Sequence, residues 1–556
     1  MTFYHDIASN MLVYDLPEPD KVMPHVVDGL RLHNGYCAIP GNLYNLQILR
    51  HFGLPVIPIV DLDYDYPIAR PFRPREHQKI MTNFMVLHPR CFNLSDMGTM
   101  KTLAALWACD YVMQQHEKEV MPNARPDTGL QPGSATRSHE TTPGGPPRLR
   151  ALISCPLSIM QRVWGDAIFQ HLVGRRTFTI IHGSAAKRRD LLRQDTDFYI
   201  INHDGAGIGA RFNKQNRIEL NGLSKDISER TDIGIVAIDE ASAYRDGTTR
   251  RHRVARAVFG QKPYFWLLTG TPTANGPLDA HGLARLVNGA MGESFRNYKS
   301  RIMYQAGPWK WEPKRGAHEE AYKLLRPSIR FEMRDCTDVP PSTEQMRDVE
   351  LSGEQKKLYK KLQEDLVLML DNGKVITAAH EAVLRLKLLQ LSCGAIYDSD
   401  HHVTKIDCGP RLAELRAVIE EASRKVIIFT PLTSVVHLLY DELKEYSRAM
   451  INGAVPPKVR DAIFQRFQAD RDPQLLIADP ATMSHGLDLF AASVVVWYGA
   501  TDRTELYLQA NRRIDRPGQT VPTTIVQLAA TKVEREIFKR AASNQSMMGA
   551  ILEMVR

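Results

Sequence analysis

Short apolar runs alternate with helical patterns in two long stretches of the chain. In the first stretch, residues 71–290, the runs are Leu152–Cys155, Phe198–Ile201, Ile235–Ile238 and Phe265–Leu268. In the second, residues 411–540, they are Val426–Phe429, Leu475–Ala478, Val494–Trp497 and Thr524–Leu528, with a helical pattern after the last. Buried runs that alternate with helices are typical of parallel sheets. The pattern predicts an α/β protein with two lobes, each a parallel sheet flanked by helices.

The remaining segments predict smaller parts. Residues 1–70 mix short apolar runs with Pro and Gly, which predicts a small N-terminal accessory domain. Residues 122–149 are rich in Pro, Gly, Ser and Thr, and are expected to form a flexible insertion in the first lobe. Residues 291–410 predict a helical linker or insertion, and residues 541–556 a C-terminal tail.

Composition narrows the class of protein. The 556 residues include 71 Lys and Arg against 63 Asp and Glu, a net charge of +8 that permits a polyanionic partner without requiring one. No apolar run reaches the roughly 18 residues of a membrane span, and no signal peptide is evident. The seven scattered cysteines form no C-x-x-C pair, which indicates reduced thiols. We therefore expect a cytoplasmic protein without a membrane partner.

Residues 92–102, FNLSDMGTMKT, predict a phosphate-binding loop between a strand and a helix. Its amides would face an anion, Lys101 would reach the β- and γ-phosphates, and Thr102 would ligate Mg²⁺. The pattern G-x-x-x-x-G-K-[ST] places glycines at 95 and 100, where this chain has Ser95 and Met100. A side chain at position 100 is expected to crowd the nucleotide or strain the turn. An ordinary strand–helix connection is the alternative. The candidate ATP ligands in the loop are Asp96, Met97, Gly98, Thr99, Met100, Lys101 and Thr102.

Residues 233–242, IGIVAIDEAS, predict a buried strand that delivers two carboxylates to the same sheet edge. Asp239 would hold Mg²⁺, and Glu240 would orient and deprotonate the attacking water. The dipeptide alone could be a turn after a strand. Together with the upstream phosphate loop it favours an NTPase.

These motifs and their order resemble the Swi/Snf-type ATPases of helicase superfamily two, which are DEAD/DEAH-box-like, over about residues 71–540. Gln78 in RPREHQ is similar to the family's adenine-recognising glutamine, and Ser242 stands where the D-E-A-H box has histidine. Within LLTGTPTANGP, Thr269, Gly270 and Thr271 resemble the segment that couples hydrolysis to movement. Further blocks resemble family motifs at 153–164, 180–189, 425–435 and 481–498, and the last of these contains Gly486.

The string QANRRIDRPGQ at 509–519 carries the most specific similarity, to the family pattern Q-x-x-x-R-x-x-R-x-G-Q. The resemblance implies that Gln509 contacts ATP, and that Arg513 and Arg516 are arginine fingers for the γ-phosphate. As an isolated string it could be a basic helix face.

The resemblance implies two tandem RecA-like P-loop lobes, ATP and Mg²⁺ as cofactors, and an ATP-dependent DNA translocase or helicase. It implies sequence-nonspecific contact with duplex or branched DNA through residues at the lobe edges: Pro156, Ser158, His203, Thr430, Thr433 and Ser484. The loop Asp96–Thr99 and the string ALWACDY resemble the stand-alone helicases of tailed bacteriophages, which implies a replication or recombination role in the host cytoplasm. Replication or recombination proteins are further candidate partners, and we expect a monomer. A nucleic-acid clamp with impaired ATP turnover and an RNA-directed enzyme of the same superfamily are the alternatives.

Overall fold

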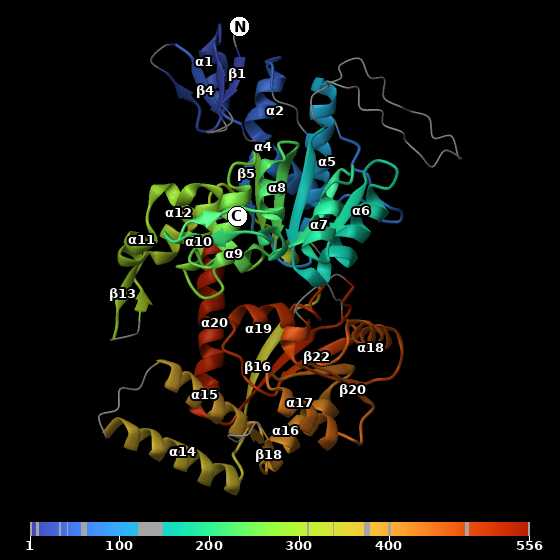
Figure 1. Ribbon diagram of the computed structural model, residues 1–556, viewed down its shortest axis with the longest axis vertical. Coiled ribbons are helices and arrows are strands. Elements are labelled where there is room, and N and C mark those ends of the chain that lie inside the picture. Colours follow the sequence, from blue (N-terminus) through green and yellow to red (C-terminus); the bar gives the residue numbers. More distant parts are fainter. Residues whose placement is uncertain are drawn as a thin grey trace. The chain divides into compact units, whose positions relative to one another are not determined.

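The protein is described from a computed structural model as two compact units (Figure 1). The structure describes residues 3–6, 11–32, 35–41, 43–56, 60, 64–120, 148–307, 311–336, 339–371, 378–397, 402–483, 489–516 and 518–553. Unit 1 comprises Met1–Thr273, Pro277–Glu332 and Ala550–Arg556, and unit 2 comprises Ala274–Gly276 and Met333–Gly549. Except for its last two residues, the predicted insertion at 122–149 lies outside the described residues.

A seven-stranded parallel sheet forms the centre of unit 1, in the order β15-β5-β12-β11-β6-β8-β7. The four apolar runs predicted as strands in this stretch all belong to it. Its strands are β5 (Arg90–Asn93), β6 (Arg150–Cys155), β7 (Phe178–Ile181), β8 (Phe198–Asn202), β11 (Ile233–Asp239), β12 (Tyr264–Leu268) and β15 (Ser328–Ile329). The prediction of a parallel α/β lobe is therefore confirmed.

Helices pack on both faces of this sheet because successive strand residues point to opposite sides. Met81 of α4 and Leu106 of α5 join Ala237 of β11 in one core, whereas Phe259 of α9 contacts Phe265 of β12. The helices of unit 1 beyond residue 70 are α4 (Glu76–Leu87), α5 (Lys101–Val120), α6 (Asp166–His171), α7 (Ala185–Leu192), α8 (Leu223–Glu229), α9 (Arg250–Phe259), α10 (Asp279–Val287), α11 (Phe295–Ile302) and α12 (Ala317–Leu324). Two hairpins, β9 (Arg211–Phe212) with β10 (Ile218–Glu219) and β13 (Met303–Gln305) with β14 (Trp311–Pro313), complete it.

The first residues of the chain form a separate antiparallel sheet in the order β1-β2-β4-β3. Its elements are β1 (Phe3–Asp6), β2 (Met11–Tyr14), α1 (Pro19–Val22), β3 (Leu30–Arg31), β4 (Cys37–Pro40) and α2 (Leu43–His51). Leu12, Tyr14, Ile39, Leu46 and Leu49 share a small core of their own. Residues 1–70 thus contain an independent sheet, although they belong to unit 1.

Unit 2 contains a six-stranded parallel sheet in the order β16-β23-β22-β19-β21-β20. The strands are β16 (Ser342–Asp348), β19 (Lys425–Phe429), β20 (Arg448–Ile451), β21 (Leu475–Ala478), β22 (Ala492–Trp497) and β23 (Thr523–Ala529). The helices are α13 (Met333–Cys336), α14 (Gly353–Asp371), α15 (Ala378–Ser392), α16 (Gly409–Glu421), α17 (Thr433–Glu442), α18 (Pro457–Ala469), α19 (Thr504–Asn511) and α20 (Lys532–Glu553), and β17 (Ala395–Tyr397) pairs with β18 (Val403–Lys405). The second parallel lobe is therefore also present.

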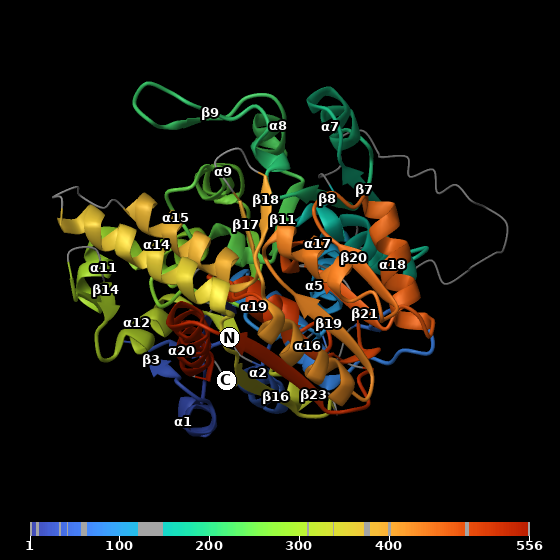
Figure 2. The same ribbon diagram turned by 90° about the horizontal axis from the view of Figure 1, so that it is seen from below.

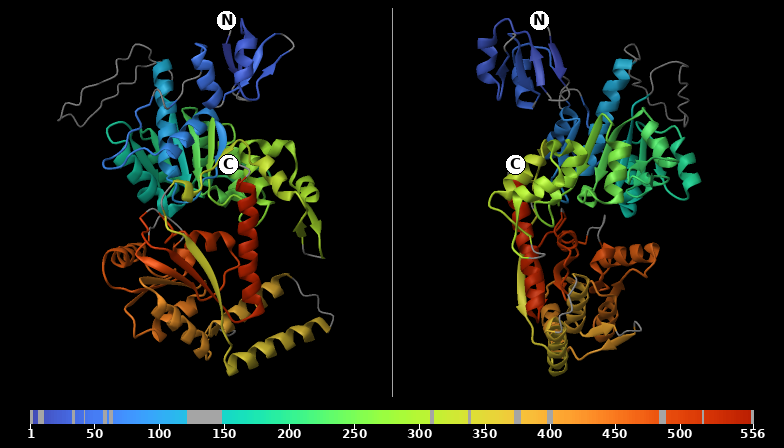
Figure 3. Two further views of the ribbon diagram at one scale, coloured as in Figure 1. Left: turned by 180° about the vertical axis from the view of Figure 1, so that it is seen from behind. Right: turned by 60° about the vertical axis from the view of Figure 1, so that its left-hand side comes forward.

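The segment 291–410 is divided between the two units and is not one helical linker. Its strand β15 joins the first sheet and β16 joins the second, where β16 lies as the yellow strand along the edge (Figure 3). Most side chains of β16, Ser-Thr-Glu-Gln-Met-Arg-Asp, are exposed, so no apolar run indicates the strand. Backbone hydrogen bonds to the buried strand β23 hold it, and these depend little on side-chain type.

The predicted tail at 541–556 continues a helix. Helix α20 extends to Glu553 and buries Ile537, Phe538 and Ala541 along one side. Near its start, the buried Glu534 pairs with the buried Arg411 of α16, with Nη2 and Oε1 2.8 Å apart. Among the described residues, no helix has the length and apolar character that crossing a membrane requires.

Candidate ATP-binding and coupling site

Three loops meet at one edge of the unit 1 sheet because their strands are parallel neighbours. Strand β12 lies between β5 and β11, with Trp266 opposite Cys91 and Phe265 opposite Val236. The loop after β5 is the predicted phosphate loop, the loop after β11 contains the two carboxylates, and the loop after β12 contains Thr269–Thr271. The carboxyl edge of a parallel sheet is where α/β proteins bind ligands.

The predicted phosphate loop is fixed at both of its ends. The Nζ of Lys101 donates to the carbonyl oxygens of Ser95 (2.6 Å) and Asp96 (2.9 Å). The backbone N–H of Ser95 donates to the Asn93 side chain at 3.2 Å, and the Ser95 hydroxyl accepts from the N–H of Phe331 at 3.0 Å. The ammonium group is therefore held at the loop, next to the helix start.

Met100 has the left-handed backbone that the sequence pattern assigns to a glycine. Its φ is 59°, and that of Gly98 is 86°. An L-residue in this region carries strain that glycine avoids. The expected strain in the turn is thus visible in the backbone. The Met100 side chain is 38% exposed, and its sulfur lies 3.4 Å from Nε2 of Gln78.

The candidate adenine-binding residue Gln78 is buried in α4 and already engaged. Its Oε1 accepts from the backbone N–H of Arg75 at 2.9 Å, which closes the first turn of the helix. The Gln78 amide therefore contacts Arg75, just before α4, through Oε1, and Met100 of the phosphate loop through Nε2. It joins the start of α4 to that loop.

Asp239 is held at the end of β11 by two hydrogen bonds. Trp164 Nε1 donates to its Oδ2 and the N–H of Glu240 donates to its Oδ1, each at 3.0 Å. Burial raises the pKa of this carboxyl, while the Lys101 charge and these two donors act in the opposite direction. Glu240 follows with a left-handed φ of 49°, which turns the chain sharply at the sheet edge.

The loop after β12 contacts the phosphate loop directly. The N–H of Thr269 donates to the carbonyl oxygen of Asn93 at 3.0 Å, and Thr271 donates its N–H to the Thr269 hydroxyl at 3.1 Å. A Cβ built on Gly270 would lie 3.3 Å from the backbone N of Met97. Any larger residue at position 270 would require the two loops to shift apart by a few tenths of an ångström. Ser242, the fourth candidate coupling residue, is buried in the turn η5 (Ala241–Tyr244).

The donor set fits ATP with Mg²⁺. Lys101 supplies a cation at the loop, and Thr102 at the start of α5 is half-buried. The Asp239 carboxylate and the Thr102 hydroxyl are oxygen ligands of the kind that Mg²⁺ prefers. Thr271 adds a buried hydroxyl without a hydrogen-bond partner among the described residues.

The candidate arginine fingers belong to unit 2, at the end of α19. Arg513 is buried, and the Nε of Arg516 donates to the carbonyl oxygen of Arg512 at 3.1 Å. Gln509 donates from Nε2 to Glu505 at 3.2 Å. Gln519 bonds the backbone of Ala492 and Ile514, which fixes the segment that carries both arginines. Gly486 lies outside the described residues.

The candidate DNA contacts differ in exposure. Ser158 and Thr433 are exposed and Pro156 is half-buried, whereas Thr430 is fully buried and its hydroxyl accepts from the N–H of Leu432 at 3.4 Å. A phosphate group from solvent therefore does not reach the Thr430 hydroxyl in this conformation. Ser484 lies outside the described residues.

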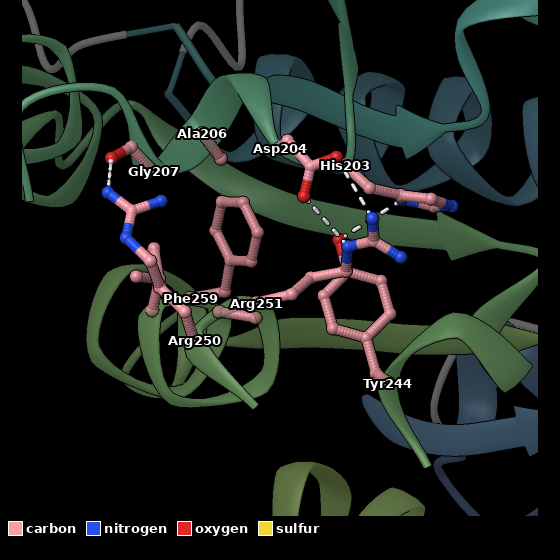
Figure 4. A pocket seen from close by; sticks show the side chains of 10 residues that line it. His203, Asp204, Ala206, Gly207, Tyr244, Arg250, Arg251 and Phe259 are labelled. Carbon is pink, nitrogen blue, oxygen red and sulfur yellow. Dashed lines mark hydrogen bonds and ion pairs between the residues drawn. The ribbon is translucent and has the colours of Figure 1, made fainter. Parts of the chain in front are cut away.

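His203 is nearly buried and belongs to a small polar cluster. Its Nδ1 lies 3.1 Å from the hydroxyls of both Ser154 and Tyr244, and these two hydroxyls are 3.2 Å apart. Beside them, Arg251 pairs with Asp204 (Figure 4). Because Tyr244 follows the acidic pair in η5, the cluster connects β6 and β8 to the turn after Glu240. Sequence reasoning missed Trp164 and Tyr244, since neither spacing nor composition indicates that they face Asp239 and His203.

Comparisons with known proteins find similar sequences and a similar structure. Residues 79–393 match the SNF2-related domain, and residues 410–518 match the helicase conserved C-terminal domain. Protein p41 of the Acyrthosiphon pisum secondary endosymbiont phage 1 is 23% identical over 510 residues, which cover 87% of this chain and 99% of p41. An uncharacterized ATP-dependent helicase of Mycoplasma genitalium is 25% identical over 307 residues, 54% of this chain and 29% of that protein. The Sulfolobus solfataricus SWI2/SNF2 ATPase core in complex with dsDNA is 19% identical, with a TM-score of 0.37 over 87% of this chain and 93% of that one.

Proposed function

Because this chain belongs to the SNF2-related family of helicase-type ATPases, we propose that it uses ATP hydrolysis to move along or remodel double-stranded or branched DNA. The observation that supports it most is the meeting of three loops at one sheet edge, which brings together Lys101, Asp239 and the Gly270 loop. Phosphoryl transfer uses a lysine that binds the phosphates and a carboxylate that holds the metal ion. The close backbone contact at Gly270 offers a route from hydrolysis to movement.

Each candidate residue has a distinct role in ATP binding or hydrolysis. Lys101 binds the terminal phosphates of ATP, Thr102 and Asp239 would hold Mg²⁺, and Glu240 takes the proton of the attacking water. Bound Mg²⁺ would neutralise charge on the phosphate oxygens. Gln78 contacts the adenine, Gln509 contacts the nucleotide, and Arg513 and Arg516 stabilise negative charge on the phosphate that leaves.

The contact of Gly270 with the phosphate loop suggests how hydrolysis is coupled to movement. A shift of the loop at Met97 would be transmitted to Gly270, because the two loops pack closely and the Thr269 N–H bonds the carbonyl oxygen of Asn93. Ser242 stands where the related box has histidine, and the His203–Tyr244 cluster provides a second connection from the acidic pair to the strands β6 and β8.

The family supports DNA as the partner, and the basic net charge of +8 permits it. Contacts to backbone phosphates carry affinity without sequence information, so the protein binds DNA without sequence preference. A phage encodes the relative p41, and we propose a role in phage replication or recombination in the host bacterial cytoplasm, as a monomer.

The test measures phosphate release from ATP with duplex, forked and single-stranded DNA and with RNA. We expect duplex or forked DNA to stimulate the wild type, and Glu240→Gln to lower the stimulated rate by about 10²–10⁴-fold. Glu229→Gln, an exposed change in α8 of the same unit, serves as the control and keeps the wild-type rate.

Two outcomes favour the alternatives. DNA binding without ATP turnover under any of these conditions would identify a clamp in which Met100 has impaired catalysis. Stimulation by RNA in preference to every DNA would identify an RNA-directed enzyme.

A further inference from the structure

A second candidate site lies on unit 1, apart from the three loops of the ATP site. It is a hollow of about 240 Å³ lined by Ile218, Gly247, His252, Arg253, Arg256 and Arg285. These residues come from the strand β10, the turn before α9, and the helices α9 and α10. The volume is many times the roughly 10–15 Å³ that a cavity needs to hold one water molecule, so a phosphate-sized group fits.

Three guanidinium groups surround this hollow, and no carboxylate lines it. Arg256 is exposed and Arg285 is half-buried, and in the part of the chain that the structure describes neither forms an ion pair. Burial lowers the pKa of Arg285, and the charges of Arg256 and Arg253 lower it further. The three cations therefore repel one another, and an anion between them would relieve that repulsion.

The other basic residues of α9 are engaged within the protein. Arg250 donates from Nη2 to the carbonyl oxygens of Gly207 (2.9 Å) and Ala210 (3.0 Å). Arg251 forms a two-point ion pair with Asp204, with both N–O distances 2.9 Å (Figure 4). The run of basic residues at 250–253 is thus not one free patch, because its first two arginines hold the fold.

The carboxylate of Asp246 acts on His252 beside the hollow, but it does not line the hollow. It accepts from the N–H (2.8 Å) and the hydroxyl (2.7 Å) of Thr248, which lowers its pKa, so it is ionised near pH 7 and offsets part of the positive charge. His252 is buried and bonded through Nε2 to the carbonyl oxygen of Gly282 at 2.9 Å, and burial lowers its pKa to about 4. It is neutral near pH 7.

A hairpin fixes the third arginine and extends the positive surface. Arg253 donates to the Asn216 side chain at 3.1 Å and stacks 4.3 Å from the ring centroid of Phe212. The hairpin β9–β10 that carries these residues projects from unit 1 beside α8 (Figure 2). Its residues Arg211, Lys214 and Arg217 are exposed. A small free anion would need only the hollow, whereas a strand of nucleic acid would also use the exposed cations beside it.

We propose that Arg253, Arg256 and Arg285 bind a backbone phosphate of DNA, at a contact separate from the lobe-edge residues of the motor. This inference rests on the proposed DNA-dependent function. The planar guanidinium fork matches two phosphate oxygens, and several forks around one hollow fix the position of a strand without reading its bases.

The test compares Arg256→Ala/Arg285→Ala with the wild type in binding to a labelled duplex DNA over a series of salt concentrations. We expect the slope of log affinity against log salt to become shallower by about 1 for one lost phosphate contact. The matched control is Arg296→Ala/Arg315→Ala, which removes two exposed arginines of the same unit that do not line the hollow. It keeps the wild-type slope.

Folding and catalysis serve as internal checks. ATP hydrolysis without DNA stays unchanged in both double variants. The unfolding temperature of Arg256→Ala/Arg285→Ala is not lowered, because the change removes like charges from a crowded cluster. Arg256→Ala alone, at the exposed rim, gives a second measurement that does not depend on the half-buried position.

Different results overturn different statements. If the wild type binds DNA and both double variants have its slope, or both lose slope equally, the hollow is not a DNA contact. If inorganic phosphate stabilises the wild type but not Arg256→Ala/Arg285→Ala while the DNA slopes agree, the hollow binds a free anion, and the assignment to DNA is overturned. If the wild type itself neither binds DNA nor is stimulated by it, the proposed function fails as well.

Discussion

The left-handed backbone at Met100 provides a sharp test of how this chain departs from the usual phosphate loop. We consider Met100→Gly, which restores the glycine of the common pattern. A φ of 59° costs a residue with a Cβ roughly 1–2 kcal/mol, and glycine does not carry this cost. Glycine in turn gains freedom in the unfolded chain, worth about 0.5–1 kcal/mol in the opposite direction.

The two contributions leave a net stabilisation of about 0.5–1 kcal/mol for Met100→Gly. Met100→Ala is the matched control, because alanine loses the same contact with Gln78 and keeps the strained φ. The difference between the two variants therefore isolates the backbone. Urea unfolding of the variants side by side, compared at equal m-values, gives this difference. If Met100→Ala is as stable as Met100→Gly, the left-handed turn carries no strain and the reasoning is wrong.

The same variants test the nucleotide site. Both remove the sulfur that lies 3.4 Å from Nε2 of Gln78, while Oε1 of Gln78 keeps its hydrogen bond from Arg75. We expect the KM for ATP to fall in both variants, with a smaller change in kcat, because the Met100 side chain stands against the amide that would contact the adenine. A KM that stays at the wild-type value in both would show that the Met100 side chain does not obstruct the nucleotide.

Three further predictions concern packing and charge. In Gly270→Ala the new Cβ meets loop backbone at 3.3 Å, so ATP turnover should fall at a stability cost of about 1–3 kcal/mol. Gly453→Ala, where the new Cβ has nothing within 4 Å, should be nearly neutral in a phosphate-release assay, and equal activity of the two variants would contradict the close approach. Because the pKa of Asp239 is raised in the folded protein, the free energy of unfolding without nucleotide should decrease as pH rises from about 4 towards that pKa. Asp239→Asn should therefore unfold at a higher temperature than the wild type at neutral pH, although it hydrolyses no ATP. A lower unfolding temperature of this variant would refute the reasoning. Asp110→Asn breaks a fully buried pair with Arg176 (2.6 Å) and should lower the free energy of unfolding by about 3–5 kcal/mol. Asp65→Asn, at an exposed carboxylate, should lower it by about 0–1 kcal/mol, and similar losses in the two variants would contradict the importance of burial.

Local patterns of apolar residues predict much of the fold. Strands such as β11 and β19 are buried on both faces, so their runs of Ile and Val stand out without knowledge of their neighbours. The edge strand β16 has no such apolar run, because most of its side chains are exposed and it pairs with β23 through the backbone. The helical middle was therefore wrongly predicted as one segment, and the division at Glu332 and Met333 became visible only in the folded units.

The candidate site shows the same division. Sequence motifs point to Lys101, Asp239 and Glu240 because their spacing after apolar runs is local. The bond from Trp164 to Asp239 spans 75 positions in the chain, and nothing in the sequence around either residue indicates it. Residues 250–253 are four consecutive basic residues in the sequence, whereas the folded chain commits Arg250 and Arg251 to internal partners.

The sequence by itself determined the family, the parallel α/β lobes and the residue types at the ATP loop, because these depend on apolar periodicity and on short motifs. Only the tertiary structure decided that Gly270 touches the phosphate loop, that Thr430 is buried, and that three arginines surround a hollow without a carboxylate. The physical reason is that a contact between distant segments depends on strand order and helix packing, which single residues and their near neighbours do not specify.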